Sequence, residues 1–143
     1  MSLQENKTLV LRFFAEMDRQ NWQAMLDTLA PDFAAHVPGA PELNADTFHQ
    51  FATVFYSAFP DLRHEFTHVI AEGDDVVTHG TFGGTHRGEL QGIAPTGTRI
   101  SVPVVHIDRV EGGKIVEHHG VANMLALMEQ LGAFTGVSPG SQV

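Results

Sequence analysis

The stretch GGKIVEHHGVANMLALMEQLG, residues 112–132, contains a glycine turn, a short strand and an amphipathic helix in direct succession. Paired glycines between two apolar strands are typical of a β-hairpin turn. One face of the helix then holds the apolar residues Met124, Leu127, Met128 and Leu131. Gly132 follows, at the place where helix C-termini favour glycine. A helix that follows directly on a hairpin predicts a sheet that packs against helices.

The first part of the chain, by contrast, has the periodicity of helices. Ser2 and Glu5 have capping-box spacing, which predicts a helix from the N-terminus. Asn21 is suited to cap a second helix, which we expect Pro31 to stop. A short strand, DFAAHV at 32–37, is expected next.

A third helix is predicted up to Pro60. Asn44 and Asp46 are both suited to cap it, and these two possibilities stay open. Its apolar stripe consists of Phe48, Phe51, Ala52, Phe55 and Phe59. The bulk of these aromatic side chains predicts a helix that lies over the sheet.

The pattern changes to strands after residue 60. Residues 62–88 and 98–121 each read as a β-hairpin, and a loop at 89–97 joins the two. Pro103 cannot donate a ladder hydrogen bond, so it predicts an edge or a bulge. Helices followed by strands indicate an α+β fold, with an antiparallel sheet covered on one face by helices. We expect one domain over residues 1–132 and a flexible tail over 133–143.

Composition and charge exclude several classes of function. The chain has 143 residues and a net charge of -9, which argues against nucleic-acid and anionic-membrane partners. It has no cysteine, so thiolate chemistry and cysteine-bound metals are excluded. The N-terminus has no signal-peptide pattern and no apolar run is long enough to span a bilayer. The expectation is a cytoplasmic protein.

The register of the last hairpin decides which residues share a face. A two-residue turn would place Asp108 opposite Glu117, an unfavourable like-charge pair. A three-residue loop with a glycine bulge instead pairs Arg109 with Glu117, and we favour it. One face then presents Val102, Val104, His106 and Asp108 beside His118 and Gly120. Apolar walls with converging polar groups are typical of a small-molecule pocket.

On that face, Asp108 is expected to lie beside His118. A carboxylate that fixes the tautomer of an imidazole produces a candidate general acid or base. The alternative interpretation is a satisfied polar pair on a sheet face, without a catalytic role.

Three stretches carry a resemblance to a known family. They are AFPDLRHEF at 58–66, GTHRGELQGIAPTG at 84–97 and VVHIDRVEGGKIVEHHGVANMLALMEQLG at 104–132. Together they resemble the SnoaL-like polyketide cyclase family, over almost the whole chain except the tail. The resemblance implies a nuclear-transport-factor-like (cystatin-like) fold: a cone-shaped barrel in which a curved sheet wraps around helices and a deep cavity.

The resemblance also implies an activity, which is ring closure of a polyketide by aldol chemistry without metal or cofactor. The family histidine matches His106, whereas the family acid positions are occupied here by Gly120 and Asn123. Glycine cannot transfer a proton, so we expect His118 with Asp108 to replace the acid, or His106 alone to stabilise an enolate. The alternative is a small-molecule-binding domain of the same fold that does not turn its ligand over.

Four further residues are candidates for substrate binding: His36, Tyr56, Val104 and Gly120. No metal site is expected. His64 and His68 would share a strand face at about 13 Å, too far to bind one ion. Because sheets of this fold commonly pack against each other, we expect a homodimer. The expected ligand is a hydrophobic, oxygenated small molecule.

Overall fold

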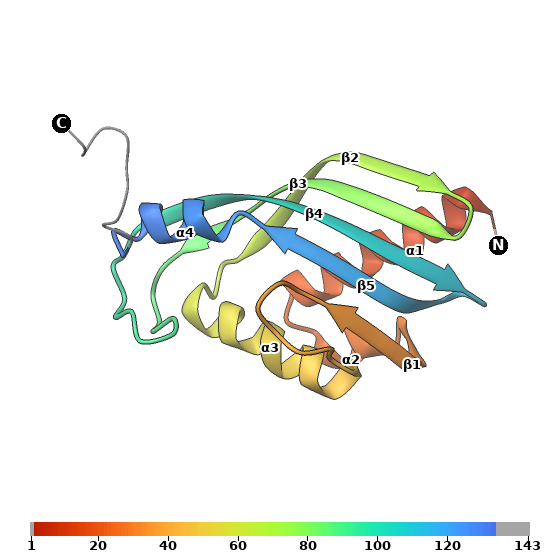
Figure 1. The fold of residues 1–143 in the computed structure, drawn as a ribbon, viewed down its shortest axis with the longest axis horizontal. Helices are drawn as coiled ribbons and strands as arrows, with labels where there is room; N and C mark the ends of the chain where they lie inside the picture. Colours follow the sequence, from red (N-terminus) through yellow and green to blue (C-terminus); the bar gives the residue numbers. More distant parts are fainter. Residues whose placement is uncertain (1, 134–143) are drawn as a thin grey trace.

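The computed structural model describes residues 2–133 and arranges them as a curved sheet with helices along one side (Figure 1). The helices are α1 (Leu3–Asp18), α2 (Trp22–Leu26), α3 (Ala45–Ala58) and α4 (Met124–Gln130). The strands are β1 (Leu29–His36), β2 (Arg63–Glu72), β3 (Asp75–Thr85), β4 (Arg99–Glu111) and β5 (Lys114–Ala122). None of the described helices is long and apolar enough to cross a membrane. The predicted tail lies outside the described residues except for Ala133.

The five strands form one sheet in the order β1-β5-β4-β3-β2. Strands β2 to β5 pair antiparallel, as predicted, but β1 pairs parallel with β5. The chain reaches β1 from the helices α1 and α2, on the concave side of the sheet, and joins the sheet at its free edge. The α+β class is confirmed, with this one parallel edge strand added.

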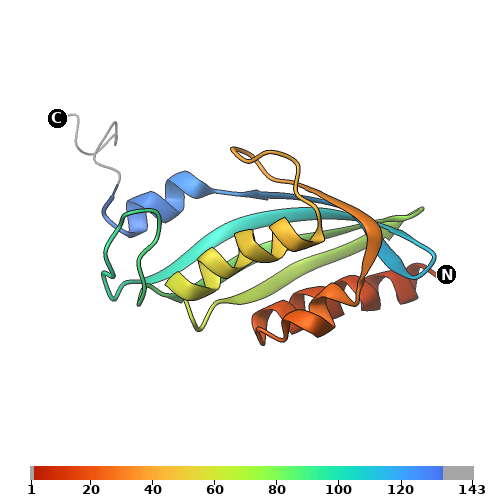
Figure 2. The ribbon, with the colours of Figure 1, turned by 90° about the horizontal axis from the view of Figure 1, so that it is seen from below.

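Helices α1 and α3 lie on the same side of the sheet, as Figure 2 shows. Their aromatic faces meet there, because the Phe13 and Phe48 rings are 5.8 Å apart. Phe13 is fully buried and Phe48 nearly so. The packing of these rings fixes the distance between the helices and the sheet, and so leaves room for a cavity farther along.

The predicted helix starts are confirmed at α1 and α3. Ser2 and Glu5 form the reciprocal capping box of α1, and Asn44, rather than Asp46, caps α3. The second helix is shorter than predicted, since it ends at Leu26. The chain is already in β1 at Pro31, which an edge strand tolerates because one side of it needs no partner.

Pro103 marks neither an edge nor a bulge, which corrects the sequence prediction. It lies in β4, the central strand, opposite Thr81 of β3. Its carbonyl accepts a hydrogen bond from the Asn123 N–H. The nitrogen and carbonyl of a strand residue point the same way, so the proline nitrogen faces the end of β5, where the β4–β5 pairing stops. No ladder bond to β3 is lost.

The last hairpin has the predicted register at the site but a different turn. Glu111 pairs with Lys114 across the two-residue turn of Gly112 and Gly113. The ladder then shifts by one residue between the pairs that contain Val110 and Arg109. This bulge restores Arg109 opposite Glu117. The predicted face is therefore confirmed, although the extra residue sits inside the strand and not in the turn.

Candidate functional site

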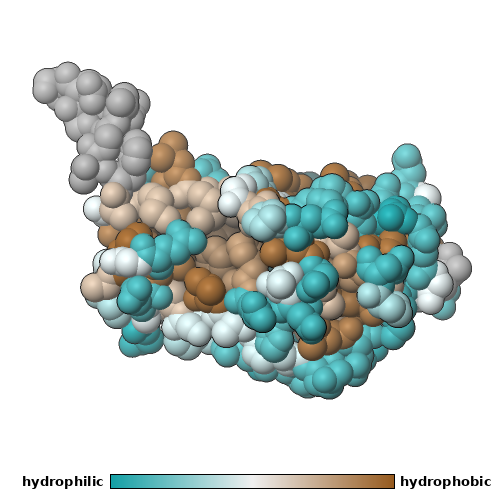
Figure 3. All heavy atoms as spheres, turned by 60° about the horizontal axis from the view of Figure 1, so that its bottom comes forward, coloured by the Kyte–Doolittle hydropathy of each residue, from teal (hydrophilic) through white to brown (hydrophobic). Residues whose placement is uncertain are grey.

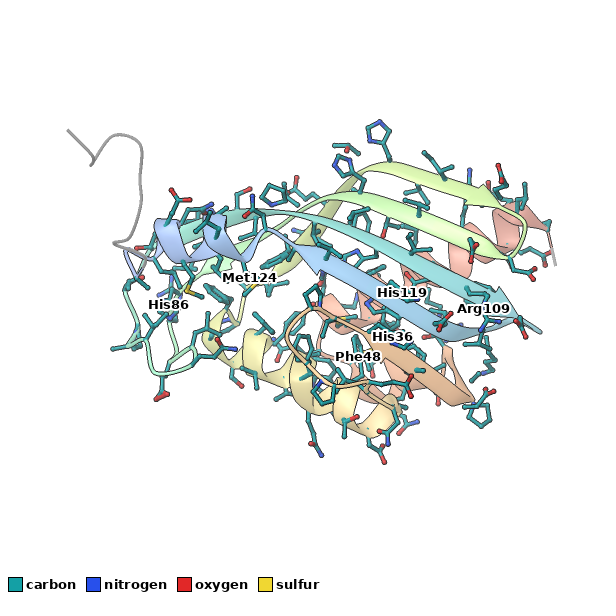
Figure 4. The ribbon with its side chains drawn as sticks, in the orientation of Figure 1. His36, Phe48, His86, Arg109, His119 and Met124 are labelled. Atoms are coloured by element: carbon teal, nitrogen blue, oxygen red, sulfur yellow. The ribbon has the colours of Figure 1, made fainter. Side chains whose placement is uncertain are left out.

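A cavity of about 240 Å³ lies between the concave face of the sheet and the helices. Its aromatic walls come from Phe14, Phe48, Phe51, Phe55 and Phe82. Apolar residues gather around a hollow on the face seen in Figure 3. Phe48 of α3 and Met124 of α4, which both line the cavity, are labelled in Figure 4. A cavity of this character suits a small apolar ligand that carries a few polar atoms.

Three of the predicted polar residues meet at one wall of this cavity. His118 Nδ1 lies 2.6 Å from Asp108 Oδ1. The ring of His106 stacks on that of His118, with 5.4 Å between the centroids. Asp108 is 0% exposed, His118 3% and His106 6%. A carboxylate and two imidazoles are therefore held together almost without water, where each electrostatic contact is strengthened.

The strand pairing explains why these side chains converge. Asp108 is the cross-strand partner of His118, and His106 is the partner of Gly120. A Cβ atom at Gly120 would lie 3.1 Å from His106 Cδ2 and 3.3 Å from His118 Nε2. Because residue 120 has no side chain, both imidazoles can lie directly against its backbone, and both rings line the cavity.

The second family acid position serves a structural purpose. Asn123 caps α4, where its side-chain oxygen accepts a hydrogen bond from the Ala126 N–H at 3.0 Å. Asparagine is among the best residues for this purpose. Asn123 is therefore engaged at the helix start and does not line the cavity.

His106 is held neutral by its surroundings. Burial, followed by the nearby charges of His118 and His64, lowers its pKa well below the ordinary 6.5. Its Nδ1 lies 3.2 Å from Thr78 Oγ1, and Thr78 is fully buried. Among the described residues, neither His106 Nε2 nor His118 Nε2 has a hydrogen-bond partner. Both atoms are free to meet a ligand.

The lowered pKa of His106 predicts acid sensitivity of the fold. Below about pH 6.5 the unfolded chain binds a proton at this residue while the folded chain does not, so stability falls as the pH falls. The residue contributes a loss of about 1.4 kcal/mol per pH unit in that range. We expect His106→Gln to lose less stability than the wild type between about pH 7 and about pH 5. Urea unfolding at the two pH values measures this, and equal losses would contradict it.

A second polar group at the cavity consists of Tyr56, Asp18 and His64, of which only Tyr56 was a predicted site residue. The Tyr56 hydroxyl donates to Asp18 Oδ1 at 2.5 Å, and His64 Nδ1 lies 2.8 Å from the same oxygen. Asp18 Oδ2 also accepts from the His64 backbone N–H. Burial, and then the Asp18 charge, raises the pKa of Tyr56, so the phenol stays protonated. Tyr56 therefore lines the cavity as predicted, with its hydroxyl occupied by Asp18.

A bulge explains why His64 was not recognised. The β2–β3 register shifts between Phe66 and His68, so the alternation of faces reverses there. His64 consequently faces inward and contacts Asp18, whereas His68 lies on the other face, against His79. The expected shared face of His64 and His68 is wrong. Gly80 accompanies the bulge, since a Cβ there would lie 1.9 Å from the Glu65 carbonyl oxygen.

His36 differs from expectation. It does not line the cavity: it follows the inward-facing Ala35 on β1, so its ring lies outside and stacks on His119. Another histidine, His86, is fully buried against Phe59, with Thr96 Oγ1 3.0 Å from its Nδ1. Val104 and Gly120 line the cavity as predicted.

The fold and the cavity define a class of small α+β domains in which a curved sheet and its helices border a pocket. The family model for SnoaL-like polyketide cyclases matches residues 8–131. The chain belongs to the SnoaL-like polyketide cyclase family. A search of curated protein sequences gave no match.

Solved structures share the fold. AclR from Streptomyces galilaeus, provisionally named a hydroxylase, is 33% identical with a TM-score of 0.87, covering 96% of this chain and 87% of its own. A provisionally named SnoaL-like polyketide cyclase from Jannaschia sp. CCS1 is 26% identical with a TM-score of 0.84. The match covers 92% of this chain and 94% of the Jannaschia chain. IdmH from Streptomyces antibioticus, provisionally named a polyketide cyclase, is 23% identical with a TM-score of 0.82. The match covers 89% of this chain and 98% of the IdmH chain. The last supports the fold alone.

Proposed function

We propose that this chain is an acid/base catalyst that closes or isomerises a hydrophobic, oxygenated small molecule by aldol-type chemistry, without a cofactor. The single observation that carries the proposal is the free, cavity-facing Nε2 of His118, whose other nitrogen lies 2.6 Å from the buried Asp108. Because the Asp108 carboxylate accepts a hydrogen bond from Nδ1–H, Nε2 is left as the proton acceptor. The family supplies the reaction class.

In the proposed reaction, His118 Nε2 removes a proton from a carbon between two carbonyl groups. The C–H electron pair forms an enolate, whose oxygen accepts a hydrogen bond from His106 Nε2–H. The enolate carbon then attacks a second carbonyl carbon of the same molecule and forms the new C–C bond. The resulting alkoxide takes the proton back from His118, so the imidazole returns to its starting state.

The tautomer of His106 depends on Thr78. If the Thr78 hydroxyl donates to His106 Nδ1, 3.2 Å away, the ring hydrogen must be on Nε2, which points the donor at the ligand. The lowered pKa of His106 fits this role, since a neutral ring donates without competing for the proton that His118 carries.

A second function is ligand binding without turnover. The observation that favours it is the absence of a carboxylate at Gly120 and the use of Asn123 as a helix cap. AclR, a solved structure 33% identical to this chain, has the provisional name of a hydroxylase and not of a cyclase. In this alternative the aromatic walls and the two imidazoles select the ligand, and no proton is transferred.

An exchange experiment separates the two functions. The chain is incubated in D₂O with a cyclic 1,3-diketone, and the loss of the central C–H signal is followed by NMR. A catalyst accelerates the exchange in proportion to the enzyme concentration, whereas a binding domain shifts the ligand signals without faster exchange. Exchange at the buffer rate with saturated binding would contradict the proposal.

The homodimer stays a prediction. The exposed apolar side chains of Ile107 and Val121 on the outer face of the sheet support it. Sedimentation equilibrium would measure the mass, and a monomer at high concentration would contradict it.

A further inference from the structure

A separate group of ligand-type side chains lies on the outer face of the sheet, where β1 meets β5. His36 and His119 are direct partners in the parallel ladder. Their rings stack with 4.6 Å between centroids and an angle of 19°. Figure 4 shows the two side chains next to each other between these strands. Glu117 lies on the same face of β5, two residues before His119.

The possible metal-ligand atoms of His36, Glu117 and His119 lie close together. His36 Nε2 lies 3.1 Å from Glu117 Oε2, and His119 Nε2 lies 3.7 Å from Glu117 Oε1. One donor atom from each residue lies within 4.8 Å of the others. Two ligands of a tetrahedral zinc ion, each about 2.1 Å from the metal, are about 3.4 Å apart. The two observed separations, which involve different oxygens of Glu117, lie on either side of that value. Side chains that are one-third to one-half exposed are free to adjust, so that one oxygen can serve both.

The neighbouring charges fit a divalent cation with one exception. Glu42 Oε1 lies 3.8 Å from His36 Nε2 and offers a fourth oxygen ligand. A glutamate carboxylate is ionised at neutral pH, so Glu117 is available as a ligand. The exception is Arg109, whose Nε lies 3.6 Å from Glu117 Oε1 and competes for that oxygen.

We propose that His36, Glu117 and His119 form a binding site for a borderline divalent cation of the Zn²⁺ type, with Glu42 or water as the fourth ligand. Two imidazoles and one carboxylate are a donor set that zinc accepts, whereas Mg²⁺ and Ca²⁺ require mostly oxygen ligands. The site lies on the face opposite His118 and is independent of the proposed catalysis.

The position of the site gives the metal a structural effect. It joins the end of β1 to β5, and the segment that follows His36 lines the cavity through Val37, Pro38 and Ala40. A shallow hollow bounded by His36, Glu42 and His119 shares Gly120 with the cavity wall. A bound ion would therefore hold the loop at one wall of the cavity in place.

The test uses the full chain without an affinity tag, treated with a chelator and then titrated with Zn²⁺ at a fixed neutral pH. Calorimetry is expected to give one saturable site, and saturation should raise the Tm by about 5 °C. Co²⁺ should give the visible absorption of a four-coordinate site. His119→Ala and Glu117→Gln should each weaken Zn²⁺ binding by about tenfold or more, since even outer-shell changes have effects of this size.

A matched control comes from the other histidine pair on the same face. His68 Nδ1 and His79 Nδ1 are 3.3 Å apart, and neither ring pairs with a carboxylate of the residues that the structure describes. His79→Ala should leave the affinity unchanged. Arg109→Gln should strengthen binding, a gain that a misfolded variant cannot produce. Absence of saturable binding would overturn the proposal, as would binding that His79→Ala abolishes and His119→Ala leaves intact.

Discussion

Replacing His118 with glutamine is expected to lower the rate of diketone α-proton exchange by about 10²–10⁴-fold, the usual effect of removing a positioned base. Glutamine fills similar space but has no atom that accepts a proton at neutral pH. The exchange rate in D₂O measures the effect, and circular dichroism checks that the variant is folded. The folding check is necessary because His118 is buried and packs against Phe13 and Phe48, so its replacement can disturb the core.

The companion variant Asp108→Asn separates positioning from structure. Asparagine is nearly the same size, but its side-chain amide does not favour the tautomer in which His118 Nε2 is the acceptor. We expect a large loss of rate together with a changed pH profile. His79→Gln, an exposed imidazole on the other face, should keep the wild-type rate. If His118→Gln exchanges protons as fast as the wild type, His118 is not the base.

Gly120→Asp is expected to raise aldol-type activity by up to about 10²-fold, because it supplies a carboxylate at the position where the family has its acid. The new Cβ would lie 3.1 Å from His106 Cδ2 and 3.3 Å from His118 Nε2, so the imidazoles must move by a few tenths of an ångström. The carboxylate would then contact the ligand from between the two rings. Cyclisation of a model diketone, followed by product formation, measures the gain.

Gly120→Ala is the matched control for this gain. It introduces the same Cβ contact without the carboxylate, so it should show only the steric effect, a rate at or below that of the wild type. If alanine and aspartate change the rate equally, the effect is steric. An unchanged rate in Gly120→Asp, with a measurable wild-type rate, would show that the acid position of the family does not correspond to residue 120.

Much of the site could be predicted because it depends on local alternation. His106 and Asp108 are two residues apart on one strand, so they must share a face. The opposite charges of Arg109 and Glu117 then indicated the register of β5. That register alone brings His118 to Asp108. The turn was predicted wrongly, but the bulge between the pairs that contain Arg109 and Val110 compensates for the missing loop residue, so the pairing at the site is the same.

The parts that could not be predicted depend on contacts between segments far apart in the chain. Asp18, Tyr56 and His64 come from three different elements, and no spacing in the sequence links them. His64 was assigned to the wrong partner because the bulge before His68 is an interruption that alternation does not reveal. His36 was expected at the cavity, but the face that its side chain takes depends on the register of β1 against β5, which shifts between Leu29 and Ala34.

The sequence by itself determined the element types, the class of the fold, the family and the one sheet face that carries His106, Asp108 and His118. These follow from periodicity, capping and turn chemistry, which act between neighbours in the chain. Only the tertiary structure decided where β1 joins the sheet, which histidines face the cavity and which meet on the outside. Those choices depend on how bulges and edge pairing fit the packed helices, and that fit is a property of the whole core.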